Sequence, residues 1–124
     1  MNIILDKDTT EFILQAPNKA LATFGPQGIN VVPVSTIRIV EDKILLVNYF
    51  MNKTIENIKN NPDISLVCWS GLDGYQIKGE IEYKTSGELF DELTAWAIEK
   101  FPEREVHGIL LVTPQHIYPI SAKT

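Results

Sequence analysis

The sequence has few of the residues that mark a disulfide-stapled, metal-binding or nucleic-acid-binding protein. It contains a single cysteine, Cys68, so no internal disulfide can form, and the usual zinc-binding patterns need several cysteines or histidines. Eleven basic residues stand against sixteen acidic ones, which gives a net charge of −5 and no basic stripe to bind a phosphate backbone. We therefore expect a reducing compartment and no nucleic-acid partner.

Long apolar runs are also missing. No stretch approaches the ~20 consecutive apolar residues that a membrane-spanning helix needs, and Asp6, Lys7 and Asp8 interrupt the apolar start of the chain. We therefore expect a cytoplasmic protein without membrane association. The length of 124 residues, with 44% hydrophobic and 22% charged residues, is typical of a single domain, here residues 1–124, that stabilises its own core.

Hydrophobic periodicity and turn residues predict many short strands and only three helices. Because parallel strands would need a crossover after nearly every strand, the pattern favours an antiparallel barrel with attached helices. Pro33 cannot donate to a strand ladder, so its strand should be an edge strand or be bulged there. The expected helices are a short one capped by Asp8 or Thr9 and stopped by Pro17, residues 53–60 with Asn52 as N-cap, and residues 88–101; the expected strands are residues 20–24, 29–40, 44–50, 64–70 and 75–83, with one or two more in 109–120 broken at Pro114.

The common catalytic motifs are absent. The sequence holds no nucleophile elbow, P-loop, dinucleotide glycine fingerprint or His-Glu-x-x-His motif. His107 and His116 have no acidic residue at metal-ligand spacing, and Cys68 lies on an apolar strand as a small core residue would. We therefore expect no metal site and no catalytic side chain.

The start of the expected helix at residues 53–60 is a candidate phosphate site. This helix begins at the end of an apolar strand, so its unpaired backbone N–H groups and its partial positive charge point outward. Lys53 and Thr54 add a cation and a hydroxyl to the first turn. The alternative is that Lys53 is merely solvated, and spacing alone does not decide between the two.

The chain resembles a known family over residues 21–83. The resemblance rests on Pro33-Val34-Ser35, on the continuous segment 48–66 with its Lys53-Thr54 helix start and Asn-Asn-Pro terminator, and on Tyr75-x-Ile77-x-Gly79. These residues are similar to those of the FMN-binding split barrels of the pyridoxamine 5′-phosphate oxidase-like superfamily. The resemblance implies a six-stranded antiparallel split barrel that forms a homodimer with FMN at the subunit interface.

The resemblance also implies where FMN would bind. The residues that match Lys53 and Thr54 hold the FMN phosphate in such proteins, and a partner subunit usually completes the pocket. Trp96 is a further aromatic candidate for an FMN contact, and its alternative role is packing in the core or at the subunit interface. The remaining implied contacts are Pro33, Val34 and Ser35 along the isoalloxazine, Asn48, Tyr49 and Phe50 on the neighbouring strand, and Trp69 and Ser70 at the end of strand 64–70.

The sequence departs from the oxidases proper at two places. Their basic C-terminal substrate-binding segment is not matched by residues 117–124, which contain no arginine, and Asn52 stands where they carry an arginine before the lysine. We therefore expect an FMN-dependent oxidoreductase that passes hydride or electrons from a reduced nicotinamide-type donor to a small organic acceptor, without true pyridoxamine 5′-phosphate oxidase activity. A non-catalytic module that binds flavin, deazaflavin or haem for storage, sensing or electron transfer stays open as the alternative.

Overall fold

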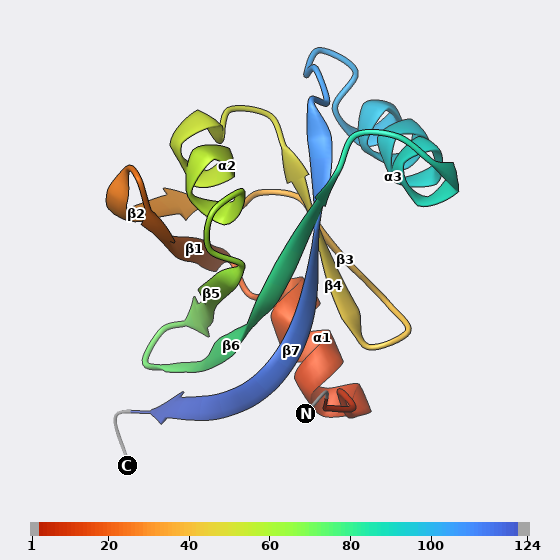
Figure 1. Ribbon diagram of the computed structural model, residues 1–124. Helices are drawn as coiled ribbons and strands as arrows, with labels where there is room; N and C mark the ends of the chain where they lie inside the picture. Colours follow the sequence, from red (N-terminus) through yellow and green to blue (C-terminus); the bar gives the residue numbers. More distant parts are fainter. Residues whose placement is uncertain (1–2, 122–124) are drawn as a thin grey trace.

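The computed structural model describes residues 3–121, in which seven antiparallel strands form one curved sheet with three helices around it (Figure 1). The strand order is β2-β1-β5-β6-β7-β4-β3. The two ends of this order, β2 and β3, follow each other in the chain and are joined by residues 34–36. The elements are α1 (Lys7–Gln15), β1 (Asn18–Gly25), β2 (Gly28–Pro33), β3 (Ile37–Val40), β4 (Lys43–Asn48), α2 (Asn52–Ile58), β5 (Asp63–Ser70), β6 (Asp73–Lys84), α3 (Glu88–Lys100) and β7 (Gly108–Ser121).

The predicted class, an antiparallel split barrel with attached helices, is confirmed, with seven strands instead of six. The expected strand 29–40 is two strands, because the chain leaves the ladder after Pro33 and pairs again only from Ile37. Pro33 lies on β2, an edge strand, as expected. The final strand stays whole across Pro114, because the register between β6 and β7 shifts between Lys78 and Gly79.

The helix caps differ from those that the sequence predicted. Asp6, not Asp8 or Thr9, caps α1 by accepting a hydrogen bond of 2.7 Å from the backbone N–H of Thr9. This bond to the ionised carboxylate lowers the pKa of Asp6. Helix α2 has Met51 at its N-cap without a side-chain cap, and Asn52 is its first helical residue. The side chain of Asn48 instead accepts the Met51 N–H at 2.8 Å, which fixes the turn into α2.

Strand β4 lies between two hydrophobic clusters. Ile44 and Leu46 point into the cluster enclosed by the curved sheet, α1 and α2, whereas Leu45 and Val47 belong to a second cluster that includes Leu93 of α3. All four of these β4 side chains are buried. Because β4 is covered on both faces, its C-terminal end is rigidly placed, and the residues after it form one wall of the site described below.

No helix in residues 3–121 is long and apolar enough to cross a membrane.

Candidate functional site

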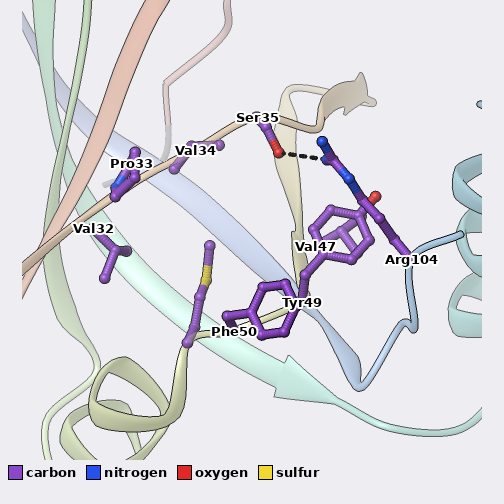
Figure 2. Close-up of a pocket in the computed structure, with 9 residues that line it drawn as sticks. Val32, Pro33, Val34, Ser35, Val47, Tyr49, Phe50 and Arg104 are labelled. Atoms are coloured by element: carbon purple, nitrogen blue, oxygen red, sulfur yellow. Dashed lines mark hydrogen bonds between the residues drawn. The ribbon is translucent and has the colours of Figure 1, made fainter. Parts of the chain in front are cut away.

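A cavity of about 350 Å³ lies where β2 and β4 end, and we call it the β2–β4 pocket (Figure 2). This volume is within the range of ordinary small-molecule sites. Five residues predicted to contact FMN line it: Pro33, Val34, Ser35, Tyr49 and Phe50. The structure thus brings together two segments that are separated by β3 and β4 in the chain.

The walls of the β2–β4 pocket are mostly apolar. Val32, Val47 and Met51 complete its lining, and the side chain of Phe50 is 89% exposed at its rim. Tyr49 is buried, and its hydroxyl lies 3.0 Å from the hydroxyl of Thr36, a buried residue of the segment between β2 and β3. This hydrogen bond ties the two walls together. A planar, largely apolar ring fits such walls, with polar contacts confined to one end.

Arg104 supplies the cation at that end of the pocket. It lies in the loop between α3 and β7, and its guanidinium donates a hydrogen bond of 3.0 Å to the hydroxyl of Ser35 (Figure 2). The guanidinium carbon is 5.1 Å from the ring centroid of Tyr49 and 3.9 Å from that of Phe101. These cation–π contacts hold the guanidinium at the pocket wall.

Arg104 was not predicted as a site residue. Neither position 52 nor the C-terminal tail carries the arginine found in the oxidases, and the loop after α3 supplies a cation instead. Arg104 stands between Glu103 and Glu105 in the most acidic part of the sequence, so the local charge gives no indication of a cationic site residue. Only the packing of α3 beside β4 and β7 carries this loop back to the end of β2.

A second, more polar pocket of about 560 Å³ lies at the start of α2, and we call it the α2 pocket. Met51 lines the β2–β4 pocket, and the next residues, Asn52 and Lys53, line the α2 pocket. Asn48 also lines the α2 pocket, and its side-chain amide donates a hydrogen bond of 2.9 Å to the hydroxyl of Tyr83. Its remaining lining residues are Gln27, Ile55, Glu56, Lys59, Tyr83 and His107.

The two members of the predicted phosphate pair are placed differently. Lys53 is exposed at the first turn of α2 and lines the α2 pocket. Thr54 is fully buried, and its hydroxyl accepts a hydrogen bond of 3.0 Å from the side-chain amide of Asn30 on β2. Lys53 therefore has access to a bound anion, whereas Thr54 anchors α2 to β2 in this structure.

The remaining predicted contacts lie farther along the sheet. Trp69 lines a third cavity, of about 400 Å³, together with Pro33 and Val34, and Tyr49 is not part of that lining. Ser70 is the exposed last residue of β5. Trp96 on α3 contacts two cations, with the Arg38 guanidinium carbon 5.3 Å and the Lys100 ammonium 4.8 Å from its ring centroid.

The part of the chain described, residues 3–121, shows no cluster of residues that could hold a metal ion. Cys68 is fully buried in the sheet core, and this burial raises the pKa of its thiol to about 11, partly opposed by the positive charge of Lys19. The thiol is therefore protonated at neutral pH and is not a nucleophile.

Comparison with solved structures finds the same fold in several bacterial proteins. HupZ of Group A Streptococcus superposes with a TM-score of 0.83 at 19% identity, covering 96% of each chain. An FMN-binding protein from Syntrophomonas wolfei superposes with a TM-score of 0.78 at 18% identity, covering 94% of this chain and 88% of the other. HutZ, described as a heme storage protein of Vibrio cholerae, superposes with a TM-score of 0.72 at 15% identity, covering 96% of each chain.

Sequence comparison covers nearly the whole chain. An uncharacterized protein of Methanocaldococcus jannaschii is 29% identical over 125 residues, which cover 94% of this chain and 83% of the relative. The sequence pattern of the family described as pyridoxamine 5′-phosphate oxidase matches residues 5–121. The chain therefore belongs to the pyridoxamine 5′-phosphate oxidase family.

Proposed function

We propose that the protein is an FMN-binding flavoprotein that holds the isoalloxazine ring in the β2–β4 pocket. The observation that carries this proposal is the pocket itself: apolar walls from β2 and β4 converge on a single polar end formed by Ser35 and Arg104. A flavin ring has the same asymmetry, with an apolar dimethylbenzene end and a hydrogen-bonding pyrimidine end. The fold shared with an FMN-binding protein supports the assignment.

The chain's own residues would bind and orient the cofactor. Tyr49 and the Pro33–Ser35 segment would fix the ring and exclude water from it, while Lys53, next to the pocket along α2, would bind the phosphate. Bound FMN supplies the redox chemistry, between a reduced nicotinamide-type donor and a small organic acceptor. No acid or base from the protein is needed for that reaction, in keeping with a pocket that lacks carboxylate and imidazole side chains.

We also propose that the protein works as a homodimer with FMN at the subunit interface. The outer face of β1 and β2 carries large apolar side chains that are exposed in the single chain: Phe24 (57%), Ile29 (86%) and Val31 (65%). The ladder register pairs Phe24 with Ile29 and Ala22 with Val31, so these side chains share one face. This face adjoins the edge strand β2, whose end forms the β2–β4 pocket, so a second copy seated there would help to cover the ring.

The test is an absorption spectrum of the freshly purified protein followed by a fluorescence titration with FMN. A flavin spectrum, or saturable quenching of FMN fluorescence, supports the proposal. Protein that is colourless and shows no saturation contradicts it. Steady-state assays of the loaded protein with nicotinamide donors and with quinone, nitro and azo acceptors then test the oxidoreductase activity, which must exceed that of free FMN.

A second candidate is a non-catalytic module that binds flavin or haem. The fold is shared with a protein described as a heme storage protein, and His107 lines the α2 pocket, where its imidazole could ligate haem iron. Titration with haemin distinguishes the two: a saturable Soret band that His107→Ala abolishes favours the haem module. Flavin binding with turnover no faster than that of free FMN favours a flavin carrier.

A further inference from the structure

The guanidinium of Arg104 has hydrogen-bonding capacity that the protein does not use. Among residues 3–121 its side chain donates to one acceptor, the Ser35 hydroxyl, although an arginine carries several N–H donors in a planar fork. Its other contacts are the ring faces of Tyr49 and Phe101, which accept no conventional hydrogen bond. The unused donors therefore belong to a group that is half-buried at the wall of an apolar pocket.

The positive charge of Arg104 also lacks a protein counter-charge. The side chains of the described residues form one ion pair, between Lys84 and Glu82, and the adjacent Glu103 and Glu105 do not pair with Arg104. Partial burial of a cation against apolar side chains carries a desolvation cost, which an anion or further acceptors would offset. The aromatic contacts offset part of that cost and hold the group in place. The guanidinium of Arg104 is therefore held, with its charge unpaired by any described residue, beside the space that a ligand would occupy in the β2–β4 pocket.

We infer that Arg104 is a specificity-determining residue that binds the oxygen-rich edge of a planar ligand in the β2–β4 pocket and favours the ligand's more negative form. This inference rests on the proposed function, under which the ligand is FMN and the edge is the pyrimidine end of its ring. That edge gains negative charge when the ring is reduced, and a fixed cation there stabilises it. Arg104 thus raises the midpoint potential of bound FMN.

A structural role for Arg104 makes a different prediction. Since Arg104 also joins the loop after α3 to the end of β2, its loss could loosen the pocket without any preference for one redox state. Loosening weakens the binding of oxidised and reduced FMN equally and leaves the midpoint potential unchanged. The potential therefore separates an electrostatic role from a structural one.

The experiment measures the FMN dissociation constant and the two-electron midpoint potential of wild-type protein, Arg104→Gln and Arg104→Lys. We expect Arg104→Gln to weaken the binding of reduced FMN about tenfold more than that of oxidised FMN, which corresponds to a fall of about 30 mV in the midpoint potential. Arg104→Lys keeps the charge but not the planar fork. The midpoint potential of bound FMN should therefore stay close to the wild-type value, while the affinity for FMN falls.

Arg38→Gln is the matched control. It removes the same charge from the chain's other arginine, which lies exposed on β3 against Trp96 and outside the β2–β4 pocket lining, so the midpoint potential should stay at the wild-type value. An equal loss of affinity for both redox states in Arg104→Gln, or an equal fall in potential in Arg38→Gln, overturns the role of Arg104 while leaving the proposed function standing. Wild-type protein that binds no FMN overturns both.

Discussion

Under the proposed function, Lys53 is the residue on which binding of the FMN phosphate should depend most. It is exposed, lines the α2 pocket beside the first turn of α2, and forms no ion pair with the described residues. We expect Lys53→Ala to weaken FMN binding by about 1.5 to 3 kcal/mol, the range for a hydrogen bond to a charged group, or roughly one to two decades in the dissociation constant. Fluorescence titration with FMN measures this.

Lys59 provides the matched control for Lys53. It lines the same pocket and carries the same charge, but it lies at the C-terminal end of α2. Lys59→Ala should change FMN affinity less than about threefold, and riboflavin, which has no phosphate, should bind wild type and Lys53→Ala equally. If Lys53→Ala bound FMN as tightly as wild type, the phosphate would lie elsewhere.

Cys68 makes stability depend on pH in the alkaline range. Its pKa is raised by burial from an ordinary value of 9.0 to about 11, so between these values the unfolded chain releases the thiol proton while the folded chain retains it. The unfolded state then binds fewer protons, and the free energy of unfolding falls as pH rises from about 9 to 11. The full loss is about 2 to 3 kcal/mol.

Urea denaturation of wild type and Cys68→Ala across this pH range measures the effect. The variant should be less stable at pH 8, because a buried side chain has been shortened, but it should lose less stability between pH 9 and 11. Comparison of the two proteins removes the titration of lysines and tyrosines, which both share. Parallel pH profiles would show that the Cys68 thiolate is not disfavoured in the fold.

At the scale of secondary-structure elements, α2 is fastened to the β1–β2 hairpin by one buried side chain. The Asn57 amide donates to the Thr23 hydroxyl at 3.1 Å and to the Gly28 carbonyl at 3.0 Å, and its oxygen accepts from the Gln27 N–H at 2.8 Å. A Cβ on Gly25 would lie 2.9 Å from the Cα of Asn57, so only glycine allows this close approach. Asn57 and the close approach at Gly25 therefore fix the position of the hairpin against α2.

Asn57→Ala should lower the free energy of unfolding by about 3 kcal/mol, because three hydrogen bonds of about 1 kcal/mol each are lost together. Asn60→Ala, which removes an exposed asparagine just beyond the same helix, is the control and should cost less than about 0.5 kcal/mol. Chemical denaturation of both variants measures the difference. Similar costs for the two would mean that the hairpin holds its place without Asn57.

The elements show how far the sequence alone determines this fold. Strand β6 and helix α3 were predicted within two residues of their ends, because the alternation of Tyr75 to Tyr83 and the apolar spacing of residues 89–101 are local signals. The break between β2 and β3 and the continuity of β7 across Pro114 were not predicted. Both depend on which strands are neighbours, since a strand accepts a proline where its N–H position needs no partner, as at an edge or a register shift.

The candidate site, like the fold, was predicted only in part. The contribution of Pro33–Ser35 and Tyr49–Phe50 to one pocket was predicted from the family resemblance, and the structure brings these segments together. Burial of Thr54 against Asn30 was not predicted, because spacing places a residue on a helix without showing which side faces the sheet. Arg104 was missed because its place in the pocket depends on how α3 packs.

At the scale of the whole molecule, the exposed apolar face of β1 and β2 is the feature that a single chain does not explain. Ile29 and Val31 lie on an edge strand, are 86% and 65% exposed, and sit beside Phe24 of β1. Contiguous exposed apolar side chains on a sheet favour association. The predicted homodimer would bury them and would place the partner subunit beside the β2–β4 pocket, so dimerisation and FMN binding should be coupled.

Val31→Asp tests this coupling. Placing a carboxylate at the centre of the buried face should convert the dimer to a monomer in sedimentation velocity experiments and weaken FMN binding at least about tenfold, since an unpaired charge in an interface costs several kcal/mol. The fold of the subunit should survive, because Val31 is exposed in the single chain. Ile98→Asp, on the exposed side of α3, is the control and should leave both assembly and FMN affinity unchanged. A Val31→Asp protein that remained dimeric would place the interface on another face, and a monomeric variant that bound FMN as tightly as wild type would show that one subunit is sufficient for the site.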